Sequence, residues 1–383
     1  MRVLIVRPYA TVPNGNTYNL QHVGLAKAFL KIGIQSDIVY FCGNRPEATQ
    51  DISTSDGSFR IFWKKALKIG KNAIFNFKSF DELVKNYDVI QTEEYEQVFS
   101  CLLALRYPYK TLIYQGPYST YFSRHYYMKS KIFDIFFQHQ LKRIGTTFVA
   151  KTYKAKKTLQ NKGFKNVAVV PVGLDVSKFE SMEKRPTLVK PGDLLYIGEL
   201  SDRRSTKFLI RLLCELREQF NQLTLTLIGE GKPEYVEECH QLTKELKVDG
   251  AITFAGKVDQ SELPDIYTKH SIFLLPSKYE IFGMVMLEAM YFGMPVISTD
   301  NGGSGVVIET GVNGIIPSSF GLEEWKTAVA GLLVDEDQQR RIGRNAAIKI
   351  REDFDWRLSA LEFEAVYKNM NGSLDENKKK FKH

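Results

Sequence analysis

Cysteine is scarce in this chain of 383 residues. The four cysteines, Cys42, Cys101, Cys214 and Cys239, lie far apart, and no two of them form a C-x-x-C pair. This spacing argues against a disulfide framework and against a zinc site. We therefore expect a protein that works in a reducing, cytoplasmic compartment and binds no metal ion.

Long apolar runs are also missing. No stretch reaches the roughly 18 consecutive apolar residues that a membrane-spanning helix requires. The apolar run at the N-terminus has the length of a strand and is interrupted by Arg7, so it resembles neither a secretory signal nor a spanning helix. The sequence predicts a cytoplasmic protein whose contact with the inner face of the cell membrane is at most peripheral.

Acidic residues are almost absent between residues 101 and 170. This segment has thirteen lysines and arginines against one acid, Asp134, so its net charge is +12, while the whole chain carries +8. The rest of the chain is therefore net acidic. A basic half of this kind indicates an anionic partner.

Within the basic segment, residues 121–144 interleave cationic and aromatic side chains, and three interpretations fit. The first is an interfacial helix on an anionic membrane, and the second is an internal amphipathic helix with a solvated basic face. The third is a surface for single-stranded nucleic acid. No nucleic-acid-binding motif accompanies these residues, so we expect no nucleic-acid partner.

The order of apolar segments indicates an α/β protein with two domains. The length favours two domains of roughly 150 to 200 residues, and β-branched runs alternate with helix-period segments, as in parallel sheets. In the first half, strands are expected at 2–6, 36–40, 89–92, 111–114, 147–149 and 168–171. In the second half, strands are expected at 194–197, 223–228, 252–255, 272–275 and 295–298.

The expected domains are both Rossmann-like. The first covers 1–180 and has its first helix at 18–31. A charged linker follows to 192, and the second domain covers 193–355. Residues 356–370 predict a helix that packs back on the first domain, and 371–383 predict a polar, disordered tail. Ligand sites in such folds lie at the carboxyl ends of the strands, so we expect two such edges to face each other across a cleft.

The most informative segment is 274–290, LLPSKYEIFGMVMLEAM. A buried strand ends at Pro276, a loop carries Glu280, and Gly283 opens a helix whose first N–H groups form an anion site suited to a diphosphate. Glu288 follows within the same helix. Two acceptor-only carboxylates beside a phosphate site suit the hydroxyl groups of a sugar and of a ribose.

A purely structural interpretation of this pair is also open. Glu280 would then be favoured by the helix dipole, and Glu288 would be a solvated residue on the helix face. The neighbours of Glu288 are apolar, however, and an unpaired carboxylate among them is costly unless a ligand or a polar group satisfies it.

Residues 196–317 resemble the catalytic domain of family 4 glycosyltransferases, a retaining group with the GT-B fold. The matching pieces are Gly198-Glu199-Leu200, Leu227-Ile228-Gly229-Glu230-Gly231, Phe254-Ala255-Gly256, Leu275-Pro276-Ser277, the Glu280 to Glu288 motif, Gly293-Met294-Pro295-Val296-Ile297-Ser298, Gly302-Gly303 and Gly311-Val312-Asn313-Gly314. The segment 170–175, with Phe179, is similar to the hinge sequence of that family.

The resemblance implies roles for the residues of the second domain. It gives Glu280 a contact with the donor sugar near the reacting carbon, and Glu288 the hydroxyl groups of the ribose. The remaining residues that the resemblance implies for donor binding are Phe282, Gly283, Met284 and Gly229. An arginine and a lysine usually hold the diphosphate in that family.

Here the pattern departs from the family, because Glu199 stands where the arginine is expected and Arg204 stands at the lysine position. Arg204 still offers a two-pronged phosphate contact, and Arg203 or Lys207 would supply the missing charge. The alternative for all three cations is a solvated helix start. Glu199 therefore puts the usual two-cation clamp in question.

The acceptor side in the first domain is less specific. Residues 13–16 resemble the glycine loop of the family, with Gly15 near the phosphates, although ordinary turn chemistry explains them equally well; the G-x-G-x-x-G of dehydrogenases is absent. No histidine ends the strand at 111–114, where the family often carries one. Gln115, Glu94 and His125 are the candidates in its place.

The function expected from this resemblance is retaining transfer of a sugar from a nucleoside-diphosphate sugar, expected to be a UDP-sugar, to an acceptor hydroxyl without a metal or other cofactor. The expected acceptor is a lipid-linked saccharide of a bacterial surface polymer. A GT-B phosphorylase and a non-catalytic nucleotide-sugar-binding subunit remain the alternatives. A glycoside hydrolase would need carboxylates that flank the scissile bond.

Overall fold

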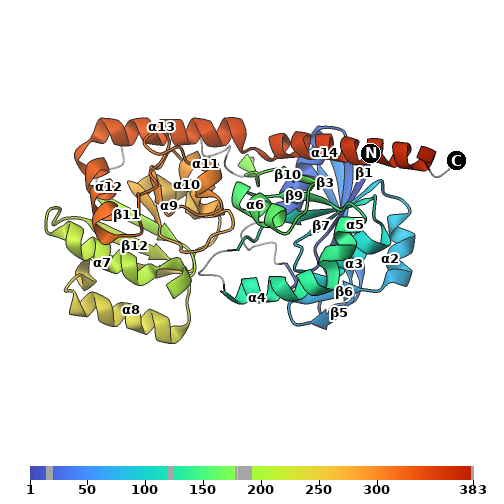
Figure 1. Ribbon diagram of the computed structural model, residues 1–383. Helices are drawn as coiled ribbons and strands as arrows, with labels where there is room; N and C mark the ends of the chain where they lie inside the picture. The colour runs from blue at the N-terminus through green and yellow to red at the C-terminus, as the bar shows by residue number, and fades with distance from the viewer. Residues whose placement is uncertain (14–19, 120–123, 177–178, 180–191, 381–383) are drawn as a thin grey trace. The chain divides into compact units, whose positions relative to one another are not determined.

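The computed structural model describes residues 1–13, 20–119, 124–176, 179 and 192–380. The chain forms two compact units, one made of Met1–Gly173 with Asp355–His383 and the other of Leu174–Phe354. Both are α/β units (Figure 1). The expected first domain ended at 180, whereas the chain leaves this unit at Gly173.

The first unit is built on an eight-stranded sheet in the order β10-β9-β8-β7-β1-β2-β4-β3. All neighbours pair in parallel except β3 and β4. Its central strands are buried along their whole length, as in parallel sheets covered on both faces. The strands are β1 (Arg2–Val6), β2 (Gln35–Phe41), β3 (Ala48–Thr54), β4 (Gly57–Lys64), β7 (Val89–Glu93), β8 (Thr111–Gln115), β9 (Thr147–Ala150) and β10 (Val167–Val169).

Helices and one small hairpin complete this unit. The antiparallel hairpin consists of β5 (Ala66–Ile69) and β6 (Asn72–Phe75). The helices are α1 (Gln21–Lys31), α2 (Phe77–Val84), α3 (Val98–Arg106), α4 (Arg124–Phe133), a π-helical segment (Asp134–Gln138), α5 (His139–Arg143), α6 (Tyr153–Asn161) and α14 (Trp356–Lys380). Residues 18 and 19, where the first helix was expected to begin, lie outside the described residues.

The C-terminal helix α14 is part of the first unit. The indole of Trp356 lies so close to Gly24 of α1 that a methyl group there would meet it at 2.5 Å. Farther along, Phe363 packs edge-on against Tyr114, and the buried Tyr367 hydroxyl donates to Gln91 of β7. The prediction of a disordered tail from 371 was wrong up to Lys380, because α14 continues to that residue.

The second unit contains a five-stranded, all-parallel sheet in the order β13-β12-β11-β14-β15. In Figure 1, α7 and α8 lie on one side of it, and α10 and α13 on the other. The strands are β11 (Asp193–Ile197), β12 (Thr224–Ile228), β13 (Ile252–Gly256), β14 (Ile272–Leu275) and β15 (Val296–Ser298). The helices are α7 (Thr206–Arg217), α8 (Pro233–Glu245), α9 (Leu263–Lys269), α10 (Met284–Tyr291), α11 (Ser304–Val307), α12 (Leu322–Val334) and α13 (Glu336–Asp353), with single turns at Asp202–Arg204 and Asp249–Ala251.

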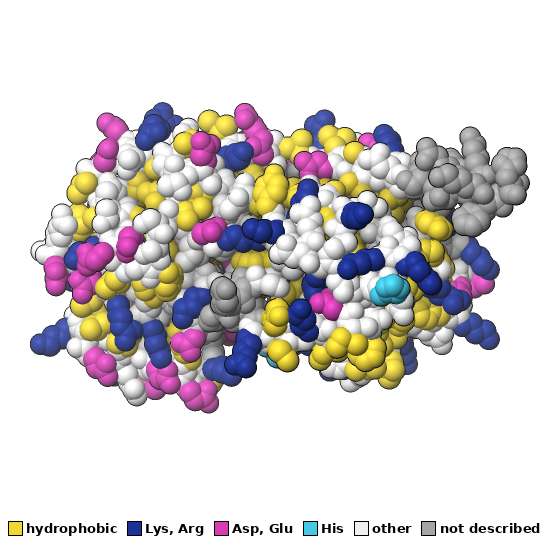
Figure 2. Space-filling model, in the orientation of Figure 1, with side chains coloured by type: hydrophobic (Ala, Val, Ile, Leu, Met, Phe, Trp, Pro, Cys, Tyr) yellow, Lys and Arg dark blue, Asp and Glu magenta, His cyan; other side chains and the backbone are white. Residues whose placement is uncertain are grey.

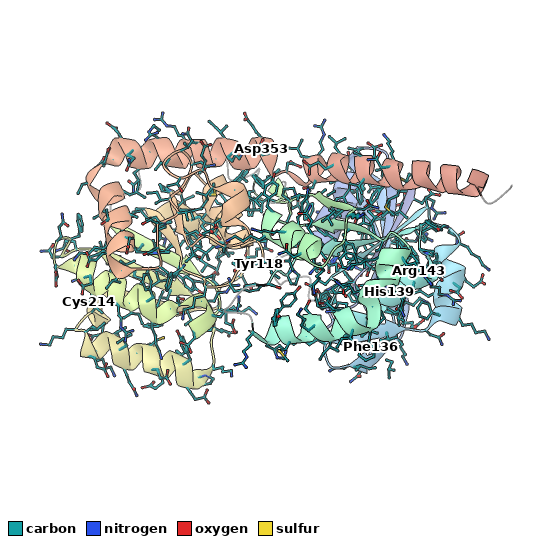
Figure 3. All side chains as sticks on the ribbon, in the orientation of Figure 1. Tyr118, Phe136, His139, Arg143, Cys214 and Asp353 are labelled. Atoms are coloured by element: carbon teal, nitrogen blue, oxygen red, sulfur yellow. The ribbon has the colours of Figure 1, made fainter. Side chains whose placement is uncertain are left out.

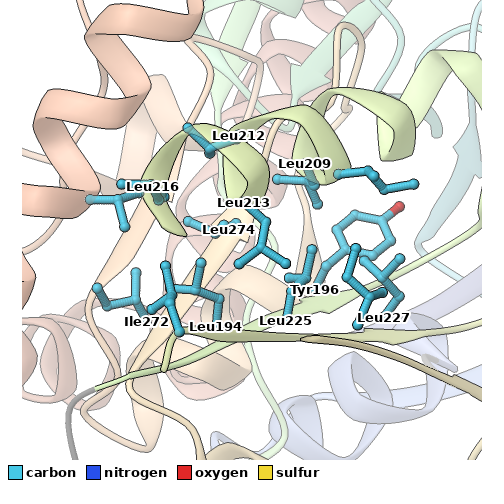
Figure 4. Packing of buried hydrophobic residues seen from close by; sticks show 14 of the residues in the cluster. Leu194, Tyr196, Leu209, Leu212, Leu213, Leu216, Leu225, Leu227, Ile272 and Leu274 are labelled. Atoms are coloured by element: carbon cyan, nitrogen blue, oxygen red, sulfur yellow. The ribbon is translucent and has the colours of Figure 1, made fainter. Parts of the chain in front are cut away.

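The core of the second unit fixes the position of α7 over the sheet. Leucines at 209, 212, 213 and 216 recur at helical spacing and are all buried. Figure 4 shows them packed against Leu194, Leu225 and Ile272 of the strands, with Tyr196 beside them. The turn that precedes α7 is therefore held at the carboxyl edge of the sheet.

Candidate donor site

The strand order places a topological switch at β11 in the second unit. β11 lies between β12 and β14, so the loops after β11 and after β14 leave the sheet side by side at its carboxyl edge. Ligand sites of open parallel sheets lie at this position. The loop after β11 carries Arg203 and Arg204, and the loop after β14 carries Glu280.

Arg204 and Glu280 form an ion pair across these two loops. Nη1 of Arg204 also donates to the hydroxyl of Ser277, 3.2 Å away, and Ser277 is fully buried. Glu280 itself is only 9% exposed. The residues predicted to contact the donor sugar and its diphosphate are thus brought together, and Ser277, which belongs to the Leu275-Pro276-Ser277 motif, helps to orient the guanidinium.

Arg203 binds different partners from those of Arg204. Its Nη1 donates to the carbonyl of Tyr279 at 3.1 Å, while its Nη2 pairs with Glu199 at the same distance. Its own carbonyl accepts from the N–H of Lys278 at 3.0 Å. Glu199 therefore binds Arg203 in this structure, and Arg203 joins the loop after β11 to the loop after β14.

Lys207 contacts helix α8. Its ammonium pairs with Glu238 of α8 and lies 4.7 Å from the centre of the Tyr235 ring. The Glu238 carboxylate raises the pKa of Lys207. The structure thus gives Lys207 a partner on α8, whereas Arg204 contacts the Glu280 loop.

Gly283 begins α10 in a left-handed conformation, with φ of 83°. A glycine adopts this conformation without strain, and a Cβ here would lie 3.2 Å from Cγ of Glu280. Phe282 and Met284 on either side are buried, so their side chains belong to the core and only their backbone is suited to a ligand. The first turn of α10 is consequently set directly beside Glu280.

The loop after β15 closes around this helix start. The N–H of Gly302 donates to the carbonyl of Glu280 at 3.1 Å. Gly303 approaches Phe282 so closely that any Cβ would lie 1.6 Å from its carbonyl oxygen. The Gly302-Gly303 piece of the sequence motif therefore permits two loops to meet.

Glu288 lies inside the unit, with 1% of its surface exposed. Its carboxylate accepts a hydrogen bond of 3.0 Å from the hydroxyl of Tyr267 on α9. The cost expected for a carboxylate in an apolar helix is thus offset by a protein hydroxyl. Because Tyr267 comes from another element, local sequence patterns did not indicate it.

Gly229 and Gly15 are two further glycines that were predicted for the donor site. Gly229 follows β12 with φ of 135°, and a Cβ there would lie 1.9 Å from the carbonyl oxygen of Gly198. Its role in this structure is the close approach of two backbones. Gly15 lies outside the described residues.

The residues predicted for the acceptor side are spread over the first unit. His125 is exposed on α4. Gln115 is fully buried, and its Nε2 donates to Glu96, to the carbonyl of Pro117 and to the hydroxyl of Tyr126. Gln115 therefore joins the ends of two strands to α4, and its contact with an acceptor stays a prediction.

Glu94 is half-buried after β7 in the left-handed region, with φ of 59°. Such a backbone costs an ordinary residue on the order of 1–3 kcal/mol and persists only where its surroundings impose it. Burial and the nearby charge of Glu93 raise the pKa of Glu94, although the hydroxyl of Tyr9 donates to it. Glu94 is a partly accessible, polar candidate that lies directly at the carboxyl end of β7.

Beside Glu94 lies a buried ionic cluster that sequence patterns did not indicate. Glu93 pairs with His22 of α1 at 3.0 Å and with Lys151 after β9 at 3.3 Å. Burial alone would raise the pKa of Glu93, but its contacts with His22 and Lys151 outweigh burial and hold that pKa well below the usual range. The three side chains come from distant parts of the chain and meet at the carboxyl edge of the sheet.

Two properties of the described residues concern metal binding and membrane spanning. Among them, no group of three or more His, Cys, Asp or Glu side chains is arranged to hold a metal ion. Within the same part of the chain, no helix has the length and apolarity needed to cross a bilayer.

The second unit is similar to a known protein family. Residues 177–349, which cover nearly all of it, match the family model of glycosyl transferases group 1. The second unit is therefore similar to glycosyl transferases group 1, and we call the matched residues the group 1 domain for that similarity. The Arg204–Glu280 pair and the start of α10 lie inside these matched residues.

Curated relatives match over a limited length. A glycogen synthase of Mycobacterium tuberculosis is 30% identical over 205 residues, which cover 54% of this chain and 49% of that protein. A D-inositol 3-phosphate glycosyltransferase of Corynebacterium jeikeium is 27% identical over 219 residues, with 53% and 52% covered. The chain therefore spans about half the length of the curated relatives it matches.

A solved structure matches over nearly the whole chain. Anabaena Alr3699/HepE in complex with UDP superposes with a TM-score of 0.74 and 17% identity, covering 96% of this chain and all of the other. At this identity the likeness establishes the fold. The chain has the GT-B fold, with two Rossmann-like domains.

Proposed function

We propose that this protein is a retaining glycosyltransferase that moves a sugar from a UDP-sugar to an acceptor hydroxyl. The observation that carries the proposal is the ion pair between Arg204 and Glu280 at the carboxyl edge of the group 1 domain, next to the first turn of α10. A guanidinium and free N–H groups suit a diphosphate. A carboxylate beside them suits the hydroxyl groups of the sugar.

The reaction follows from these groups. The bond between the anomeric carbon and the diphosphate oxygen breaks, the acceptor oxygen bonds to the same face of that carbon, and the acceptor proton passes to the departing diphosphate. Arg204 and the start of α10 stabilise the charge that develops on the leaving group. Glu280 positions the sugar. Since these groups supply the positive charge, the proposal includes no metal ion or other cofactor.

Support for a uridine nucleotide comes from the neighbour of similar fold. Alr3699/HepE has been solved with UDP and also with UDP-glucose. In this chain the ribose is assigned to Glu288, whose carboxylate lies on α10 eight positions after Glu280. Opening of the Tyr267 hydrogen bond, or sharing of the carboxylate, would accompany donor binding.

The proposed acceptor is a lipid-linked saccharide of a bacterial surface polymer, bound by the first unit while the protein contacts the cytoplasmic face of the membrane. Glu94 is the acceptor-side residue best suited to bind a saccharide hydroxyl, because it is accessible, polar and fixed by its backbone. The basic and aromatic segment near α4 supports a lipid-linked rather than a freely diffusing acceptor.

The test is turnover of a panel of nucleotide sugars by the purified full chain, with a saccharide acceptor and with or without inorganic phosphate. We expect release of UDP that depends on the acceptor, and a product whose anomeric configuration by NMR equals that of the donor. Turnover that requires phosphate would identify a phosphorylase. Binding of nucleotide sugar without any turnover or hydrolysis would identify a non-catalytic subunit.

A further inference from the structure

A continuous helical stretch on the first unit has an apolar face on its outside as well as its inside. It comprises α4, the π-helical segment and α5, residues 124–143. On the inside, Ser130 bonds to Glu96, Phe133 packs against Tyr95, and Leu141 is fully buried. These contacts attach the stretch to the unit and leave its opposite side exposed.

The exposed side carries large apolar residues at helical spacing. Met128, Ile132, Ile135 and Phe136 follow one another at intervals of four, three and one, which places them on one face. Ile135 is 79% exposed and Phe136 is 65% exposed. Figure 3 labels Phe136 with His139 and Arg143 along this stretch. Contiguous apolar side chains on a surface mark an interaction site.

The exposed charged side chains of this stretch are all cationic. Its only acid, Asp134, turns inward, where it pairs with Lys162 at 2.6 Å and accepts from the Tyr95 hydroxyl at 3.1 Å. Lys131, Lys142 and Arg143 are exposed. The outer face thus combines apolar side chains with cations and has no carboxylate of its own.

The β5–β6 hairpin of the same unit has a similar character. Leu67 and Ile69 of β5 are exposed, and the neighbouring charged residues Lys68 and Lys71 are both cationic. Figure 2 shows hydrophobic side chains gathered at the lower edge of the first unit, where Figure 1 draws this hairpin, with lysines and arginines above them. A second element therefore offers exposed apolar and basic residues on this unit.

We propose that the outer face of residues 124–143, assisted by the β5–β6 hairpin, binds the surface of an anionic lipid bilayer. Ile135 and Phe136 insert among the acyl chains near the headgroups, and the surrounding lysines and arginines contact the lipid phosphates. The purpose of this contact, delivery of a lipid-linked acceptor, rests on the proposed function. Lipid binding itself requires no transfer.

Charge complementarity decides between a bilayer and a second copy of this chain. Two copies that met through this face would bring lysines and arginines together, and the cores of protein interfaces are depleted in lysine. An anionic bilayer accepts both the apolar side chains and the cations. Lysine stems also extend along the interface while their ammonium groups reach the phosphates.

The experiment is flotation of the full chain with vesicles of phosphatidylcholine, with or without phosphatidylglycerol. We expect binding to the anionic vesicles that weakens as salt rises, and little binding to phosphatidylcholine alone. The double variant Ile135→Ser/Phe136→Ser should bind about a hundredfold more weakly, since each of the two buried apolar side chains contributes about a factor of ten. The matched control is Val334→Ser/Ile348→Ser, which removes exposed apolar residues from α12 and α13 of the second unit and should bind like the wild type.

Several results would overturn the inference. Equal binding of the double variant and wild type to anionic vesicles is one, and equal binding of wild type to both kinds of vesicle is another. A wild-type dimer on size-exclusion chromatography that the double variant dissociates would identify a second copy as the occupant. Turnover of the nucleotide sugar with a soluble acceptor should be unchanged in the double variant, so failure of lipid binding and failure of the proposed transfer are separate results.

Discussion

Arg204 has two tasks in the proposed reaction, and both follow from its position between two loops. In this structure its guanidinium pairs with Glu280 and donates to the hydroxyl of Ser277. A donor diphosphate would place a second anion beside the same group. A guanidinium has five donors in a rigid fork, so it can serve both a carboxylate and a phosphate.

Replacement of Arg204 should therefore be severe. Arg204→Ala removes the cation that stabilises the leaving group, and loss of such a donor lowers turnover by roughly a hundredfold to a thousandfold. Arg204→Lys should recover only part of the rate, because an ammonium cannot make a two-pronged contact. Steady-state turnover and donor affinity under identical conditions measure both effects.

The neighbouring cations provide controls for that series. Lys207→Ala breaks a pair with Glu238 on α8, and Arg203→Ala breaks contacts with Glu199 and Tyr279. Each should affect turnover less than Arg204→Ala. A crippled Lys207→Ala enzyme beside a nearly normal Arg204→Ala enzyme would move the phosphate contact to Lys207.

Glu288 should act on binding more than on chemistry. Glu288→Gln keeps the volume and can still accept from Tyr267, but it removes the charge proposed to hold the ribose hydroxyls. Hydrogen bonds to charged groups contribute about 1.5–3 kcal/mol, so donor affinity should fall roughly tenfold to a hundredfold. Calorimetric titration with the donor measures this, and unchanged affinity would remove Glu288 from the site.

Asp37 controls stability in acid within the first unit. Burial alone would raise its pKa, but hydrogen bonds from Arg60 and from the Tyr87 hydroxyl outweigh burial and lower the pKa. The ionised form therefore stabilises the fold at pH values above the ordinary range of aspartate, about 3.9. That stabilisation is lost as the pH falls through the lowered pKa of the folded state.

Asp37→Asn should accordingly lower the free energy of unfolding by about 1.5–3 kcal/mol at neutral pH. The difference between wild type and variant should shrink as the pH is lowered below about 4. Urea unfolding at a series of pH values measures it. A difference that stays constant down to acid pH would show that the charge of Asp37 has no part in stability.

At the scale of elements, periodicity and composition were sufficient for most parallel strands and for helix α10, whose first turn is the proposed diphosphate site. Buried parallel strands have continuous apolar runs, and the Gly283 turn has a distinctive sequence. The edge strand β3, its neighbour β4 and the β5–β6 hairpin were missed; β3 is largely exposed and polar, and β5 is short. Their pairing depends on partners that no local pattern specifies.

The same limit applies to the site. The Glu280 loop was singled out because it follows a predicted strand and precedes a glycine that opens a helix, whereas Arg204 was singled out through the family resemblance. Ser277 as a partner of Arg204, Tyr267 as a partner of Glu288, and the meeting of His22, Glu93 and Lys151 all depend on contacts between elements far apart in sequence. Physical complementarity required a partner for Glu288 but could not identify it.

The turn after β12 tests how the elements of the group 1 domain meet. Gly229→Ala would place a Cβ in contact with the backbone of Gly198 and strain a residue at positive φ, so it should destabilise the second unit by on the order of 1–3 kcal/mol. The control Gly331→Ala, inside α12 with open space around it, should be neutral or stabilising by up to about 1 kcal/mol. Thermal unfolding of both variants provides the comparison, and a stable Gly229→Ala protein would contradict the assigned close approach.

At the scale of the whole molecule, two Rossmann-like units of similar size have different specialisations. The second carries the group 1 domain with its ion pair, and the first carries Glu94, the buried Glu93 cluster and the basic, apolar outer face. The C-terminal helix α14 returns the chain to the first unit through Trp356 and Tyr367. We propose that the second unit binds the donor. The first unit then binds the acceptor and the membrane surface.

The central claim, that the second unit binds a donor sugar through Glu280 and transfers it, is tested most directly by turnover of a UDP-sugar in the Glu280→Ala variant. We expect no measurable transfer, a thermal unfolding midpoint close to that of the wild type, and normal turnover in the control Glu238→Ala, which removes the partner of Lys207. A folded Glu280→Ala protein that transfers sugar at the wild-type rate would contradict the account.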